Sequence, residues 1–117
     1  MQNLLVKVTV GDDAPEKCLQ GLTVAATAAA SGVPLSLWLA GEAVWLATGK
    51  KDVVLEGSPP ASVLLAGILE EWGVSVCTQC LARRDIGPED LLDGVAIGGA
   101  ATFVAEAVTD NVQALVY

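Results

Sequence analysis

The first candidate for chemistry in this chain is a Cys-x-x-Cys pair, Cys77 and Cys80, among three cysteines in all. The pair follows a short apolar run and is followed within a few residues by Arg83 and Arg84. A cysteine becomes nucleophilic as the thiolate, and nearby positive charge favours that form. The chain has no histidine, which excludes Ser-His-Asp and Cys-His catalysis within one chain.

Three interpretations of the pair remain open from the residues alone. In the first, Cys77 or Cys80 is a nucleophile that accepts, holds or passes on sulfur, or undergoes reversible oxidation. In the second, the pair binds a metal, although a structural zinc site needs four ligands and only Cys18 remains as a third sulfur. In the third, both thiols are inert packing residues, because free cysteine is among the most buried side chains. We interpret Cys18, on the apolar face of a predicted helix, as core.

The elements around the pair favour the first interpretation. Residues 74–76 are predicted to form a strand, which places Cys77 at a carboxyl end, where reactive groups gather in open α/β sheets. A helix over residues 78–84 would put Cys77 near its N-terminus, whose partial positive charge stabilises a thiolate. Arg83 and Arg84 would add full positive charges.

Other residues are predicted to complete the site around the thiols. Gln79 is a neutral spacer that could donate a hydrogen bond. Gly98 and Gly99 precede a predicted helix and favour a tight turn at a pocket, although such a turn could also cradle an anion. The predicted pocket residues are Gly41, Trp45, Gly98 and Gly99.

The order of elements predicts an α/β fold with a mostly parallel sheet of about five strands. The apolar runs at residues 4–10, 35–39, 74–76, 95–97 and 112–117 are expected strands, and residues 53–55 are either a small strand or packed loop. Helices are expected from Asp13, as N-cap, to Gly32, and over residues 42–47, 61–72 and 100–108. Strands that are apolar on both faces indicate a sheet covered by helices on each side.

Composition limits the organisation and the partners. A chain of 117 residues fits a single domain, residues 1–117, and its 53% of hydrophobic residues predicts that another subunit covers part of the surface. A formal net charge of −8 argues against nucleic acid and against an anionic membrane surface as partners.

Further features concern location and cofactors. No secretory signal or membrane-spanning stretch is visible, and an odd cysteine count favours a reducing cytoplasm. The GGAATF segment lacks the spacing of a dinucleotide fingerprint, and no complete metal set is present, so neither a cofactor nor a metal is predicted.

The sequence resembles the DsrE/DsrF sulfur-relay family, also labelled predicted peroxiredoxins, over nearly its whole length. Four segments in order carry the resemblance: VGDDAPEKCLQGLTVAATAAASG, LSLWLAGEAVWLA, VCTQCLARRDI and GGAATFVAEAV. The resemblance implies a three-layer α/β/α sandwich that assembles as a homotrimer or hexamer. It also implies that Cys77 matches the cysteine that carries a persulfide between sulfur donor and acceptor proteins.

The match differs from single-cysteine carriers at Cys80, which opens a route to a disulfide with Cys77. Asp85 and Ile86 also follow the arginines where a glycine is common in the family. The thioredoxin-fold peroxiredoxin motif is absent, so any enzymatic activity is expected to be sulfur transfer or thiol redox chemistry. The alternative is a non-catalytic oligomeric module that binds a small anion or nucleotide at the strand-end pocket.

Overall fold

Five parallel strands form one sheet in the order β4-β3-β2-β1-β5 in the computed structural model, which describes residues 2–117. The strands are β1 (Asn3–Val8), β2 (Leu35–Leu39), β3 (Gly73–Cys77), β4 (Val95–Gly98) and β5 (Val112–Val116). The predicted five-stranded parallel sheet is therefore confirmed. Parallel pairing brings the carboxyl ends of β1, β2 and β3 to one edge, where β3 ends at Cys77.

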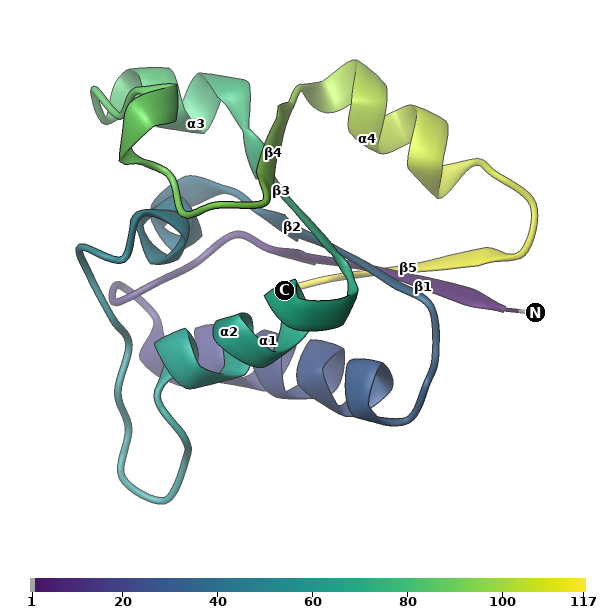
Figure 1. Ribbon diagram of the computed structural model, residues 1–117, viewed down its shortest axis with the longest axis horizontal. Helices are drawn as coiled ribbons and strands as arrows, with labels where there is room; N and C mark the ends of the chain where they lie inside the picture. The colour runs from purple at the N-terminus through teal and green to yellow at the C-terminus, as the bar shows by residue number, and fades with distance from the viewer. Residues whose placement is uncertain (1) are drawn as a thin grey trace.

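Helices cover both faces of the sheet, which gives the three layers of an α/β/α sandwich (Figure 1). One face carries α1 (Pro15–Ala30) and α2 (Ala61–Glu71), and the other carries α3 (Thr78–Arg83) and α4 (Ala100–Ala107). Two 3₁₀ helices, η1 (Gly41–Thr48) and η2 (Pro88–Asp90), follow β2 and α3.

The core lies mainly between the sheet and the α1–α2 layer. The strands supply apolar residues to both faces, as buried parallel strands do. The small residues of α1 let this helix lie close to the sheet, and Ala25 is fully buried. The largest fully buried side chains are Trp38, Leu5, Leu22, Leu37, Leu39, Leu65, Ile68, Val6, Val8, Val44, Val74 and Val76.

Two local predictions have a definite outcome. The prediction that Asp13 caps α1 is wrong: Ala14 is the N-cap residue, and the Asp13 carboxylate instead accepts a 2.8 Å hydrogen bond from the Gly11 N–H. This local bond to a preceding N–H competes with capping because it uses a side-chain oxygen of Asp13. Residues 53–55 form packed loop rather than strand, with Val53 buried.

The second helical layer covers its part of the sheet incompletely. No residue of β4, α4 or β5 is buried. Val104, Val108 and Val116 expose 55%, 74% and 62% of their surface. Within the described chain, no helix combines the length and the apolar character that a membrane crossing requires.

Candidate functional site

Cys77 lies at the junction of a strand and a helix. It is the last residue of β3 and the N-cap residue of α3, and it is paired in register with Gly98 of β4. Its side chain is half-buried. The predicted strand and the helix that follows it are confirmed, so this sulfur stands at the carboxyl edge of the sheet.

Cys80 lies one turn further along α3 and is buried. Its Sγ accepts a hydrogen bond of 3.2 Å from the backbone N–H of Gly41. Gly41 has a φ of 54°, and a Cβ at this residue would collide with the Thr9 carbonyl oxygen. Only glycine therefore lets the start of η1 approach Thr9, directly after β1, so closely.

The environment of Cys77 favours its thiolate. Burial alone would raise the pKa of Cys77, but hydrogen bonds from the Cys80 side chain and from the backbone N–H groups of Cys80 and Gln79 outweigh that effect. The Lys7 ammonium adds a further favourable charge, and the pKa of Cys77 lies below its ordinary value of 9.0. The contribution of Gln79 thus comes from its backbone.

A cavity of about 410 Å³ opens beside the half-buried thiol. Trp38 is part of its lining, and a Cβ at Gly98 would come within 2.6 Å of the Trp38 ring. Gly98 is therefore needed for this indole to lie against β4 beside Cys77. The lining residues are Lys7, Trp38, Cys77, Thr78, Gln79, Gly99, Ala100 and Phe103.

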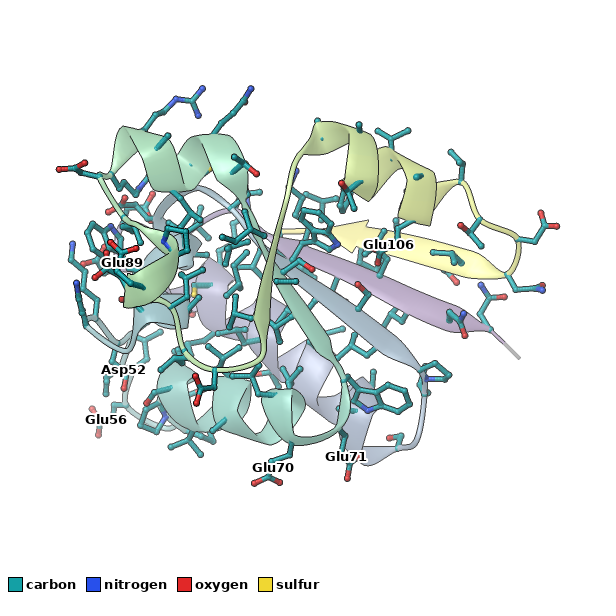
Figure 2. The ribbon with its side chains drawn as sticks, turned by 45° about the horizontal axis from the view of Figure 1, so that its top comes forward. Asp52, Glu56, Glu70, Glu71, Glu89 and Glu106 are labelled. Atoms are coloured by element: carbon teal, nitrogen blue, oxygen red, sulfur yellow. The ribbon has the colours of Figure 1, made fainter. Side chains whose placement is uncertain are left out.

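Aromatic rings and one ammonium form a connected group in this cavity. The rings of Trp38 and Phe103 meet edge to face with centroids 5.5 Å apart, a favourable geometry for aromatic pairs. Lys7 Nζ lies 4.6 Å from the centroid of Phe103. Trp38 Nε1 donates a 3.2 Å hydrogen bond to Oε2 of Glu106, a residue of α4 that is labelled in Figure 2.

The two arginines of α3 have different surroundings. Arg84 Nε lies 2.6 Å from Glu42 Oε2, and Arg84 Nη1 donates a 3.1 Å hydrogen bond to the Cys80 carbonyl oxygen. The guanidinium of Arg84 thereby joins α3 to η1. Arg83 is exposed on α3.

The predicted pocket residues fall into separate places. Gly99 lines the Cys77 cavity, and Gly98 packs under Trp38 beside it. Gly41 contacts Cys80 rather than this cavity. Trp45 lies apart from it on η1, where Lys51 Nζ is 4.6 Å from the ring centroid.

Sequence reasoning missed Lys7 and Phe103 as site residues. Lys7 was detectable in principle, because a charged residue interrupts the otherwise apolar run of residues 4–8. In β1 it points to the same face as the cavity. Phe103 carried no such signal, since an aromatic residue in an apolar helix is typical of a core.

The remaining cysteine is a core residue, as the sequence predicted. Cys18 is fully buried in α1. Burial, with the negative charges of Asp13, Asp12 and Asp52, raises the pKa of this thiol to about 11. Across residues 2–117, His, Cys, Asp and Glu side chains do not gather in threes as they would around a metal ion.

The fold is that of a known class of protein. The model of the DsrE/DsrF-like family matches residues 2–113. The chain belongs to this family, as the resemblance of its sequence indicated, and it has the family's sulfur-relay type of fold. No curated protein has a sequence that matches the chain.

Solved structures show the same fold. The YchN protein from E. coli is 22% identical, with a TM-score of 0.80 and 100% of both chains covered. A protein of unknown function from Methanobacterium thermoautotrophicum is 13% identical, with a TM-score of 0.71 and 100% of both chains covered. A conserved protein of unknown function from Bacteroides thetaiotaomicron is 13% identical, with a TM-score of 0.64 over 98% of this chain and 95% of its own.

Proposed function

We propose that this protein is a sulfur carrier in which Cys77 holds a persulfide, with Cys80 as a resolving thiol. The observation that carries the proposal is the half-buried Cys77 thiol of lowered pKa, which lines an open cavity at the end of β3. The thiolate is the form that attacks sulfane sulfur, and a lowered pKa increases the share of Cys77 in that form.

The different surroundings of the two sulfurs support this division of roles. Cys77 lines the cavity, whereas Cys80 is buried and is bonded to the Gly41 N–H. A donor therefore reaches Cys77 first. The Cys80 thiolate can then attack the inner sulfur of the Cys77 persulfide, so that a Cys77–Cys80 disulfide forms and hydrosulfide leaves with the electron pair.

Charged groups near the pair have two proposed tasks. Lys7 stabilises the anionic sulfur of Cys77 directly, as its contribution to the pKa indicates. Arg84 holds η1 against α3 through Glu42, and this contact keeps the Gly41 N–H at Cys80. Arg83 is exposed on α3 and suits contact with an acidic partner protein.

The carrier is proposed to work as a homo-oligomer, a trimer or hexamer, in a reducing cytoplasm. The poorly covered face of α4, β4 and β5 supports association of identical chains, because its valine side chains are exposed. The free thiols fit a reducing compartment. A sulfur acceptor protein would approach the Cys77 cavity, which opens at one edge of the sheet.

The test is to expose the protein to a persulfide donor and to map the added mass of 32 Da per sulfur atom, roughly, by peptide mass spectrometry. We expect the added sulfur on Cys77, no labelling in Cys77→Ser, and a longer-lived persulfide in Cys80→Ser because resolution is blocked. If both variants accept sulfur as readily as the unchanged protein, the proposal is wrong.

The same cavity also suits the alternative of a non-catalytic module that binds a small anion, because Lys7 lies in it. Thiol titration separates the two functions. A Cys77 that titrates at or above its ordinary pKa and alkylates slowly would favour the binding module over the carrier.

A further inference from the structure

The Lys7 ammonium lies in the Cys77 cavity without a carboxylate partner. Lys7 is half-buried in β1 and contacts the face of Phe103. In the described part of the chain, the cations of the two ion pairs are Lys50 and Arg84. A partly desolvated cation that faces an open cavity attracts an anionic ligand, because no carboxylate of the described chain forms an ion pair with it.

The cavity has an apolar wall beside Lys7 and is too large for a simple inorganic anion alone. Trp38, Phe103 and Ala100 supply flat apolar surface beside Lys7. A volume of about 410 Å³ falls in the range of cavities that hold small organic ligands. One cation beside aromatic faces suits an organic anion with a short carbon body.

We infer that the sulfur donor of this site is the persulfide of a small organic thiol that carries a carboxylate. The carboxylate lies at Lys7, the carbon body lies against Trp38 and Phe103, and the outer sulfur reaches Cys77. This inference rests on the proposed function and adds the chemical class of the donor. A protein-bound persulfide is the competing source, and small donors that transfer sulfur without any preference for the carboxylate in the experiment below would favour it.

The transfer balances without any further reactant. The Cys77 thiolate attacks the outer sulfur of the donor R–S–SH. A bond forms between Cys77 Sγ and that sulfur, the donor's S–S bond breaks, and R–S⁻ leaves with the electron pair. The proton stays on the transferred sulfur, so the products are Cys77–S–SH and a thiolate of the same charge as the one consumed.

The binding part of the inference is tested with two alkylating reagents of nearly equal shape, anionic iodoacetate and neutral iodoacetamide. Their rate constants at Cys77 are measured by peptide mass spectrometry in the full-length protein. Both reagents react with the same Cys77 thiolate, so the ratio of the two rates does not depend on the pKa of Cys77. The ratio therefore reports only how strongly the site prefers an anionic reagent. A unit charge about 5 Å away changes that ratio roughly fourfold even at the dielectric constant of water.

Three variants decide the result. Lys7→Met keeps the apolar contact with Phe103 and is expected to lower the iodoacetate-to-iodoacetamide ratio roughly fourfold. Lys7→Arg keeps the charge and should retain the ratio. Lys17→Met, at an exposed residue of α1, makes the same change of net charge away from the cavity and should leave the ratio unchanged. An unaltered ratio in Lys7→Met overturns the inference.

The transfer itself is tested with the persulfides of 3-mercaptopropionate and of its amide. We expect faster sulfur transfer to Cys77 from the carboxylate donor, and loss of this preference in Lys7→Met. Equal rates from both donors overturn the inference while the carrier function stands. If neither donor places sulfur on Cys77, the proposed function fails, and the alkylation ratio alone then decides whether Lys7 binds anions.

Discussion

At the scale of single residues, Cys77 and Cys80 have the same side chain in two unlike environments. Cys77 receives hydrogen bonds from the first turn of α3 and lines the cavity. Cys80 faces inward to the Gly41 N–H. The two thiols differ in access and in hydrogen-bond partners, and this difference is the basis for the proposed roles of attacking and resolving sulfur.

The cationic partner of Cys77 could not be predicted from spacing along the chain. Arg83 and Arg84 are near the thiols in sequence, but the charge that affects the pKa of Cys77 is that of Lys7. Arg84 instead pairs with Glu42, which is 42 residues away. An ion pair between residues far apart in the chain leaves no signal in the local sequence. Lys7 did leave such a signal, because it is a charged residue within an apolar strand.

Cys18 gives a pH-dependent prediction at the residue scale. Its folded pKa of about 11 lies above that of an exposed thiol, so its stabilising effect is complete below about pH 9 and is lost as the pH rises toward 11. We expect the unchanged protein to lose about 2 kcal/mol of unfolding free energy relative to Cys18→Ala between about pH 8.5 and pH 11.

Urea unfolding of both proteins at several pH values measures this difference, and the comparison cancels groups that titrate in both. A gap between the two curves that stays constant over that interval would show that the Cys18 thiol is not desolvated in the native state.

At the scale of elements, the contact of η1 with β1 and α3 depends on one glycine. Gly41→Ala is expected to reduce stability by more than about 3 kcal/mol, because it combines a positive φ with a collision at the Thr9 carbonyl. Gly57→Ala is the matched control, since Gly57 also has a positive φ but an added Cβ would meet nothing within 4 Å. It should cost about 1 kcal/mol.

Chemical denaturation measures both glycine variants. Similar losses in the two would mean that the approach of Gly41 to Thr9 is relaxed in solution, and the hydrogen bond to Cys80 would then lose its structural basis.

The Glu42–Arg84 ion pair is the second link between η1 and α3. Both side chains are partly exposed, so each single alanine substitution should cost only about 1 kcal/mol. The larger expected effect is on Cys80, whose alkylation should become several-fold faster as η1 separates from α3. The double variant should react no faster than either single one, because the residues act as a pair.

The exposed Lys50–Asp90 pair supplies the control for this cycle. Lys50→Ala should leave the alkylation rate of Cys80 unchanged. Additive effects of Glu42→Ala and Arg84→Ala would contradict the view that the pair acts as one link.

The elements themselves were largely predictable from the sequence. Parallel strands that are buried on both faces are short apolar runs, and each predicted run of the sheet became a strand. Helix ends were less predictable, as Asp13 shows, because its carboxylate had an alternative local donor in the Gly11 N–H. The cavity was only partly predictable, because its walls come from β1, β2, α3 and α4 together.

At the scale of the whole molecule, the second helical layer leaves apolar surface uncovered. Val104 on α4, Val108 at the C-cap of α4 and Val116 on β5 are all exposed. Exposed apolar patches of this kind commonly mark an interface between chains. The high share of hydrophobic residues predicted such a surface. Its location could not be predicted, because it depends on which helical layer covers its face of the sheet incompletely, and only the fold shows that.

We expect Val108→Asp to shift the protein from oligomer to monomer, because a carboxylate buried in an interface is costly. Sedimentation velocity measures the change, and Val54→Asp, in an equally exposed loop residue remote from α4, is the control. A monomeric unchanged protein, or an oligomer that tolerates Val108→Asp, would contradict this assignment of the interface.

The most direct test of the account is the pH dependence of Cys77 alkylation by iodoacetamide, followed by peptide mass spectrometry in the unchanged protein. The account predicts that the rate at Cys77 rises to its plateau through a pKa below 9.0, while Cys18 stays unreactive until the protein unfolds. A Cys77 that titrates at 9.0 or above, or that reacts as slowly as Cys18, would contradict it.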